Sequence, residues 1–222
     1  MLSDRFVRRA LVATAAAVIP VAATVLSPAW TASAQPCPDV EVVFARGTSE
    51  APGVGRVGQA LADSLRAQLG GRTVGTYGGN YPATYDFLNA AGGATDAENR
   101  IALMAQQCPG TRIVLGGYSQ GAAVVDMLAG VPPLGNRIGN IGSAPPLAGS
   151  LNGNVAAVAV FGNPATKFGN PVSATGSFAG KAIDLCADGD PICSDGRNPF
   201  AHTRYETPEF IGPAAGFVAG RV

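Results

Sequence analysis

Lysine and histidine are the scarcest reactive side chains in this sequence, and charge as a whole is sparse. Of 222 residues, 14% are charged; the only lysines are Lys167 and Lys181, and the only histidine is His202. No run of Lys or Arg occurs, so the chain has no basic patch for phosphates, and we expect no nucleic-acid partner. The cysteines contain no C-x-x-C pair and there is one histidine, so we expect no zinc or other metal site.

The first 34 residues have the layout of a secretory signal peptide. Three arginines lie among the first nine residues, an apolar run covers residues 10–26, and Ala32-Ser33-Ala34 provides an A-x-A cleavage site before Gln35. A retained membrane anchor is the alternative, but this run is shorter than the roughly 20 residues of a membrane-spanning helix and contains Pro20. We therefore predict a signal peptide over residues 1–34 and a secreted protein.

The remaining residues, 35–222, fit a single domain by length and show no repeats and no domain boundary. Five short apolar or β-branched runs predict strands. Two of them are apolar almost throughout, which is typical of strands buried on both faces of a parallel sheet. The runs are 40–45, 73–77, 112–117, 155–162 and 181–186.

Helical patterns separate these runs. In residues 54–69, apolar side chains recur at steps of three and four, and Gly70-Gly71 then ends the helix. Residues 94–108 repeat this spacing, residues 122–130 form a short apolar segment, and the Pro/Gly-rich residues 131–150 are predicted to be a long connection. Alternating strands and helices predict a three-layer α/β sandwich with right-handed crossovers.

The four cysteines predict two disulfides, because an exported chain with an even cysteine count usually pairs them. Three pairings are possible in principle. Cys37 and Cys108 each stand just ahead of an apolar run, so they lie side by side if those two strands are parallel neighbours. Cys186 and Cys193 then close the short loop CADGDPIC.

Ser119 lies at the centre of the motif G-Y-S-Q-G, residues 117–121. The bare pattern G-x-S-x-G is weak evidence in a glycine-rich chain, but here it directly joins a buried strand to a helix. A nucleophile elbow has this arrangement, because the tight turn presents the serine hydroxyl above the carboxyl ends of the strands. The backbone N–H of Gln120 then points to where a substrate oxyanion would form.

A serine hydroxyl needs a base, and His202 is the only histidine that can serve. It follows the last predicted strand, as the chain order Ser, acid, His of hydrolases requires. A lone loop histidine is more often an ordinary surface residue. The candidate acids between them are Asp184, Asp188, Asp190 and Asp195. Asp184 falls inside the strand pattern, and spacing alone does not choose between Asp188 and Asp190.

The segment GVGRVG, residues 53–58, matches the G-x-G-x-x-G of dinucleotide-binding proteins. That site needs the glycines directly after a strand and an acidic residue about 20 positions further on. Here RGTSEAP intervenes after the strand, and RTVGTYGGN carries no Asp or Glu. We therefore interpret these glycines as loop and packing residues and expect no organic cofactor.

Six motifs in one order resemble the cutinase family of serine esterases, most of all its actinobacterial cutinase-like members. They are FARGTSE, GGNYPAT, GGYSQGA, FGNP, CADGDPIC and AHTRY, and the resemblance covers nearly all of residues 35–222. It implies a lidless α/β-hydrolase fold, a three-layer sandwich with a central five-stranded parallel sheet.

The resemblance also implies roles for individual residues. It assigns a catalytic triad of Ser119, Asp190 and His202, preferring Asp190 because the acid lies three residues before the second cysteine of the small loop. It assigns the oxyanion hole to Thr48 and Gln120. The disulfides that it implies are Cys37–Cys108 and Cys186–Cys193, which agree with the pairing argued from the strands.

Aromatic residues stand where the family's substrate loops carry aliphatic ones. These residues are Tyr81, Tyr85, Phe87 and Phe200. We predict that they contact an acyl chain, while ordinary loop packing is the alternative.

The combined expectation is a secreted, monomeric serine carboxylesterase that hydrolyses short- to medium-chain acyl esters without a cofactor and makes transient contact with a lipid or cell-envelope surface. An acetylxylan esterase of the same fold is the nearest rival. A catalytically silent secreted binding or antigenic protein is the rival from another class.

Overall fold

One parallel sheet organises the protein, whose computed structural model describes residues 36–135 and 141–222. Its strand order is β2-β1-β3-β4-β5 and every pair is parallel. The three central strands consist mostly of apolar residues and glycine and are almost wholly buried, because helices cover both faces. The strands are β1 (Val40–Ala45), β2 (Val74–Gly78), β3 (Arg112–Tyr118), β4 (Val155–Phe161) and β5 (Ala182–Leu185).

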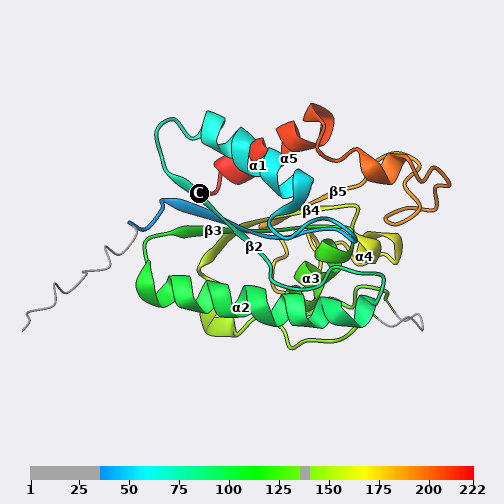
Figure 1. Ribbon diagram of the computed structural model, residues 1–222, viewed down its shortest axis with the longest axis horizontal. Helices are drawn as coiled ribbons and strands as arrows, with labels where there is room; N and C mark the ends of the chain where they lie inside the picture. Colours follow the sequence, from blue (N-terminus) through cyan, green and yellow to red (C-terminus); the bar gives the residue numbers. More distant parts are fainter. Residues whose placement is uncertain (1–35, 136–140) are drawn as a thin grey trace, which may run out of the picture. The chain divides into compact units, whose positions relative to one another are not determined.

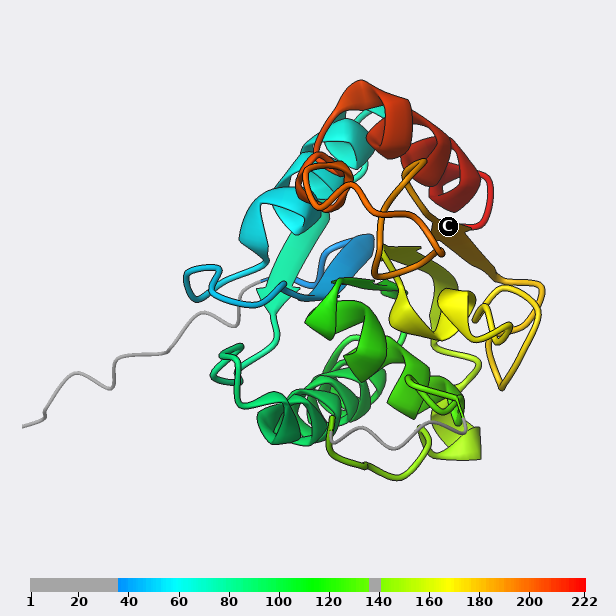
Figure 2. The same ribbon diagram turned by 90° about the vertical axis from the view of Figure 1, so that its right-hand side faces the viewer.

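Two helical layers enclose this sheet (Figures 1 and 2). Helices α1 (Gly55–Gln68) and α5 (Pro208–Ala219) cover one face. The other face is covered by α2 (Ala90–Gln107), α3 (Gln120–Ala129) and the single turn α4 (Pro164–Lys167). Three short 3-10 helices complete the connections: η1 (Phe87–Asn89), η2 (Gly149–Leu151) and η3 (Ala201–Thr203).

Helix α1 shows how the sequence produces this packing. Val57, Leu61 and Leu65 recur every four residues and are fully buried against the sheet. Each such side chain contributes about 1.5–3 kcal/mol by leaving water. The helix ends at Gln68, ahead of Gly70 and Gly71, which both adopt positive φ.

The three-layer α/β-hydrolase fold and its five-stranded parallel sheet confirm the prediction. Helices α2 and α5 differ most from the expected pattern. Helix α2 begins at Ala90, four residues before the predicted range, across Gly92 and Gly93. Helix α5 was not predicted, because Pro213 and two glycines interrupt its pattern; burial of its apolar face, including Phe210 and Val218, holds it in place.

Both disulfides form with the expected pairing. Cys37–Cys108 joins the segments that enter the neighbouring strands β1 and β3, with a Cα–Cα distance of 5.5 Å. Cys186–Cys193 closes a loop with a sequence separation of 7. The wide separation of 71 residues in the first bridge removes more entropy from the unfolded chain, worth about 4 kcal/mol in the loop-entropy model.

Within the described ranges, no helix is both long and apolar enough to cross a membrane. The predicted signal peptide, residues 1–34, lies outside the described residues.

A buried acid links α3 to the ends of two strands. Asp126 has no exposed surface, and its Oδ1 accepts from Asn163 Nδ2 at 2.9 Å, which also donates to Asp184 Oδ1 at 2.9 Å. Asp126 Oδ2 has no hydrogen-bond partner among the described residues. Burial raises the pKa of Asp126 well above its ordinary value; the Asn163 hydrogen bond opposes this and the nearby Asp184 charge adds to it.

This raised pKa predicts that rising pH costs stability. Above about pH 4 the unfolded chain releases the Asp126 proton while the folded chain keeps it, so the free energy of unfolding falls by up to about 1.4 kcal/mol per pH unit until the raised pKa is reached. Asp126→Asn should remove that slope. Urea unfolding from pH 5 upward measures it, with the surface variant Asp63→Asn as control; equal slopes in wild type and Asp126→Asn contradict the prediction.

Candidate active site

Ser119 occupies a strained turn between β3 and α3. Its φ of 56° and ψ of −116° lie in a region that non-glycine residues rarely adopt. Such a conformation costs of the order of 1–3 kcal/mol and persists only where the surroundings enforce it. The turn carries the serine hydroxyl to the carboxyl end of the sheet, as predicted for a nucleophile elbow.

The two glycines of the motif make this turn possible, because without side chains they permit close contact between backbone segments. A Cβ on Gly117 would lie 2.1 Å from the carbonyl oxygen of Gly121, and a Cβ on Gly121 would lie 1.9 Å from that of Ala45. Neither approach is compatible with a side chain. The motif is therefore a steric requirement for packing the start of α3 against β3 and β1.

His202 lies within hydrogen-bond distance of the serine. It sits in η3, and its Nε2 is 2.8 Å from Ser119 Oγ. Its Nδ1 is 2.7 Å from Asp190 Oδ2. The structure therefore brings together an alcohol, an imidazole and a carboxylate that the sequence separates by up to 83 residues.

Of the candidate acids, Asp190 is the one that contacts the imidazole. Its side chain has no exposed surface, whereas Asp188 and Asp195 are exposed and Asp184 bonds to Asn163 and Thr166. Of the two residues that spacing left open, Asp188 and Asp190, the structure therefore places Asp190 against the imidazole.

Hydrogen bonds keep this buried carboxylate ionised. Burial alone would raise the pKa of Asp190, but donation from His202, from the Tyr205 hydroxyl and from the Ile192 N–H holds it below the ordinary value. The Cys186–Cys193 disulfide closes the loop that carries Asp190. An ionised, fixed carboxylate can hold the imidazole in one tautomer and orientation.

Thr48 and Gln120 lie together beside the serine. Thr48 Oγ1 donates to Gln120 Oε1 at 3.2 Å, which joins the loop after β1 to the start of α3. Gln120 is the first residue of α3, so its backbone N–H has no carbonyl partner within the helix. Such an N–H at a helix N-terminus suits a developing negative charge.

Arg46 and Glu50 hold the loop that carries Thr48, a role that the sequence pattern did not predict. Arg46 is 4% exposed and donates to the carbonyls of Glu50 and Gly79, each at 3.0 Å, and to that of Tyr81. The Glu50 carboxylate accepts from the Gly47 N–H at 2.7 Å. Their position in the motif FARGTSE was the available signal.

Residues of the other sequence motifs make contacts that explain why these residue types occur there. Gly162 of FGNP has φ of 58°, and a Cβ there would lie 2.7 Å from His202 Cε1, so the imidazole packs against bare backbone. Tyr118 of the elbow donates to the His202 carbonyl at 2.5 Å. In GVGRVG, Gly53 backbone fills the space beside Gly78, which agrees with the packing interpretation.

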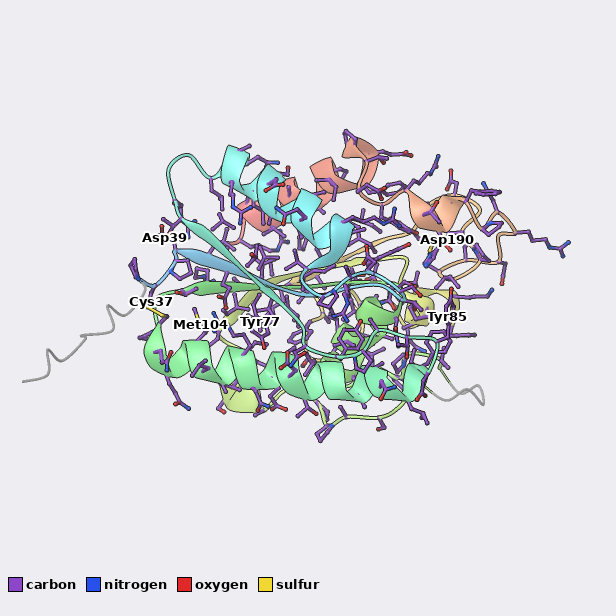
Figure 3. All side chains as sticks on the ribbon, viewed as in Figure 1. Cys37, Asp39, Tyr77, Tyr85, Met104 and Asp190 are labelled. Atoms are coloured by element: carbon purple, nitrogen blue, oxygen red, sulfur yellow. A yellow bond between two sulfur atoms is a disulfide. The ribbon has the colours of Figure 1, made fainter. Side chains whose placement is uncertain are left out.

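The aromatic residues expected to contact substrate divide into two groups. Tyr85, Phe87 and Phe200 are exposed, at 77%, 40% and 78%. Figure 3 shows Tyr85 at the same end of the protein as Asp190, opposite Cys37. Tyr81 corrects the prediction: it is 5% exposed, its hydroxyl donates to the Arg46 carbonyl, and it belongs to the core beneath α2 and α3. Its role is to brace the loop.

This fold, with a serine on a strand-to-helix turn beside an imidazole and a buried carboxylate, defines an α/β-hydrolase. The chain belongs to the cutinase family, whose model, described as Cutinase, matches residues 36–222. The protein is a serine carboxylic-ester hydrolase, and the resemblance drawn from its motifs is confirmed.

Individual proteins agree with this assignment. The chain is 50% identical over 216 residues to Phospholipase Culp4 of Mycobacterium tuberculosis (strain ATCC 25618 / H37Rv), covering 96% of this chain and 92% of that protein. Trichoderma reesei cutinase in complex with a C11Y4 phosphonate inhibitor is 38% identical, with a TM-score of 0.66 and coverage of 83% and 77%. An acetylxylan esterase structure at 0.90 Å resolution is 25% identical, with a TM-score of 0.70 and coverage of 84% and 99%.

The contact between Gly162 and the imidazole predicts a selective loss of activity. Gly162→Ala should displace His202 and lower ester hydrolysis by about 10²-fold, since small misplacements of reacting groups carry such costs. Gly169→Ala is the matched control, because Gly169 also has positive φ (78°) but nothing within 4 Å. Both variants should lose about 1 kcal/mol of stability from left-handed strain. Equal activities in the two folded variants contradict the prediction.

Proposed function

We propose that Ser119, His202 and Asp190 form the catalytic triad of a secreted carboxylesterase. The observation that carries the proposal is the unbroken pair of contacts, 2.8 Å from Ser119 Oγ to His202 Nε2 and 2.7 Å from His202 Nδ1 to Asp190 Oδ2. This is the geometry that a general base needs to activate a hydroxyl.

The proposed reaction runs through an acyl-enzyme. His202 takes the proton of Ser119 as the oxygen attacks the ester carbonyl carbon, and the N–H groups of Thr48 and Gln120 receive the oxyanion. The imidazolium then donates that proton to the departing alcohol. A water molecule, deprotonated by His202, then attacks the acyl-enzyme. The bond between the acyl carbon and Ser119 Oγ breaks, the imidazolium returns its proton to Ser119, and the acid is released while Asp190 maintains the imidazole tautomer.

The proposed substrates are short- to medium-chain acyl esters, including lipids. Support comes from the aromatic rim, defined here as the exposed residues Tyr85, Phe87 and Phe200, which offers apolar contact. Tyr85 lies at the same end of the protein as Asp190 (Figure 3). A relative named a phospholipase is consistent with a lipid substrate. We propose that the enzyme works as a monomer, that residues 1–34 direct export, and that residues 35–222 form the mature domain; two disulfides agree with an extracellular location.

Ser119→Ala should abolish hydrolysis of p-nitrophenyl butyrate, with a loss of at least about 10⁴-fold, because the nucleophile is removed. Ser150→Ala, an exposed serine in η2, is the control and should keep full activity. Labelling of wild type but not Ser119→Ala by a fluorophosphonate probe would distinguish an active esterase from a silent binding protein. A Ser119→Ala variant with the wild-type rate would exclude the mechanism.

The acyl group that this enzyme prefers should be longer than acetyl. We expect kcat/KM to be higher for butyrate and octanoate esters than for acetylated xylan, because the exposed aromatic rim favours apolar chains. The second candidate, an acetylxylan esterase, is favoured by the TM-score of 0.70 to such an enzyme. A panel of esters with graded chain length measures the preference, and the reverse order would establish that second candidate.

A further inference from the structure

Tyr205 is a buried residue three positions after His202, and its hydroxyl reaches the acid of the site. Its side chain has no exposed surface, and the hydroxyl donates to Asp190 Oδ2 at 2.5 Å. This is the same oxygen that lies 2.7 Å from His202 Nδ1. Two donors therefore share one carboxylate oxygen, while the other oxygen accepts from the Ile192 N–H at 2.8 Å.

The direction of the Tyr205 hydrogen bond is fixed by its surroundings. The Ala187 N–H donates to the phenol oxygen at 2.9 Å, so that oxygen already acts as an acceptor. Cys193 Sγ lies 3.3 Å away, but it carries no hydrogen because it is bonded to Cys186. The two acceptors within reach of the phenol hydrogen are a disulfide sulfur and a carboxylate oxygen. The charged oxygen is the stronger acceptor, so the phenol donates to Asp190.

The ring of Tyr205 is held by the core. It packs against Phe161 at the end of β4, Phe210 at the start of α5 and Tyr118 at the end of β3, with centroid distances of 6.1, 4.8 and 5.7 Å. Asp190, by contrast, lies in a loop. The phenol therefore connects a loop carboxylate to three rigid elements of the fold.

We propose that Tyr205 is a positioning residue of the active site. Its hydroxyl fixes the Asp190 carboxylate and takes up part of the negative charge that this carboxylate otherwise offers to the imidazole. This inference rests on the proposed function. It assigns two effects to one hydroxyl: the carboxylate is held at a fixed angle to His202, and less of its negative charge is available to stabilise the imidazolium.

Other ionisable groups surround the site, and we expect their contacts to stay the same when the Tyr205 hydroxyl is removed. Burial raises the pKa of Tyr118 to about 12, so this phenol stays neutral near neutral pH. Arg56 of α1 is paired with Glu50 and Glu206 and lies over the Tyr118 ring. The Arg204–Glu209 pair, at 3.9 Å, lies at the start of α5.

Tyr205→Phe tests the proposal by removing one oxygen and keeping the ring. We expect kcat to fall about 10-fold with KM nearly unchanged, since orientation for the chemical step is lost. We also expect the acid limb of the pH–rate profile to move up by about half a pH unit, because the unshared carboxylate stabilises the imidazolium better.

A second readout does not depend on hydrolysis. The chain has one histidine, so the imidazole signals in NMR spectra of the untagged protein belong to His202. The titration midpoint of these signals should rise in Tyr205→Phe. If wild type hydrolyses no ester, the proposed function fails, while this titration still tests the Tyr205 contact.

Tyr77→Phe is the matched control. The Tyr77 hydroxyl also bonds a carboxylate, Asp96, at 3.0 Å, and lies on β2. Both variants should lose some thermal stability, but only Tyr205→Phe should change kcat and the His202 midpoint. A folded Tyr205→Phe protein with wild-type kcat and midpoint would show that Tyr205 is a core aromatic only.

If Tyr205→Phe does not fold, a more acidic phenol at position 205 tests the proposal by the opposite change, a stronger hydrogen bond to Asp190. Incorporation of 3-fluorotyrosine at position 205 keeps the ring and strengthens the donor, so the His202 midpoint should move to lower pH. An unchanged midpoint in that protein overturns the proposal.

Discussion

A carboxylate removed from water stays ionised only where hydrogen bonds replace its hydration, and the active site depends on one such group. Asp190 is fully buried, and its oxygens accept from Ile192, His202 and Tyr205. These donors come from its own loop, from η3 and from the segment before α5. The carboxylate thus ties together three segments that lie outside the strands, and the imidazole is oriented by its contact with that carboxylate.

The serine depends on a different constraint, which is close contact between backbones. Gly117 and Gly121 let α3 begin almost in contact with β3 and β1, and the strained conformation of Ser119 follows from that packing. The proposed nucleophile, Ser119, therefore stands on rigid elements, while the proposed acid and base, Asp190 and His202, stand outside the sheet and the long helices. Loops need separate fixation to match that precision, which here comes from a disulfide, a buried phenol and the bare backbone at Gly162.

The sequence predicted those parts of the protein that depend on adjacent residues or on a periodic pattern of apolar residues. Buried strands showed as apolar runs, and the elbow showed as glycines around Ser119, because each needs particular residues at adjacent positions. Helix α5 was missed because tertiary burial overrides its Pro213. Spacing did not separate Asp188 from Asp190, since a turn determines which one points inward. Tyr81 was misplaced because an aromatic residue in a loop motif looks the same whether it braces the loop or faces solvent.

The two disulfides differ in what they secure and in how accessible they are. Cys37 is exposed at the end of the sheet away from Asp190, whereas Cys193 is 3% exposed beside Tyr205. A small thiol would therefore reach the outer bridge first. Partial reduction of this enzyme would then make it thermolabile before it became inactive, because the cross-link between Cys37 and Cys108 would be lost while the loop that carries Asp190 remained closed.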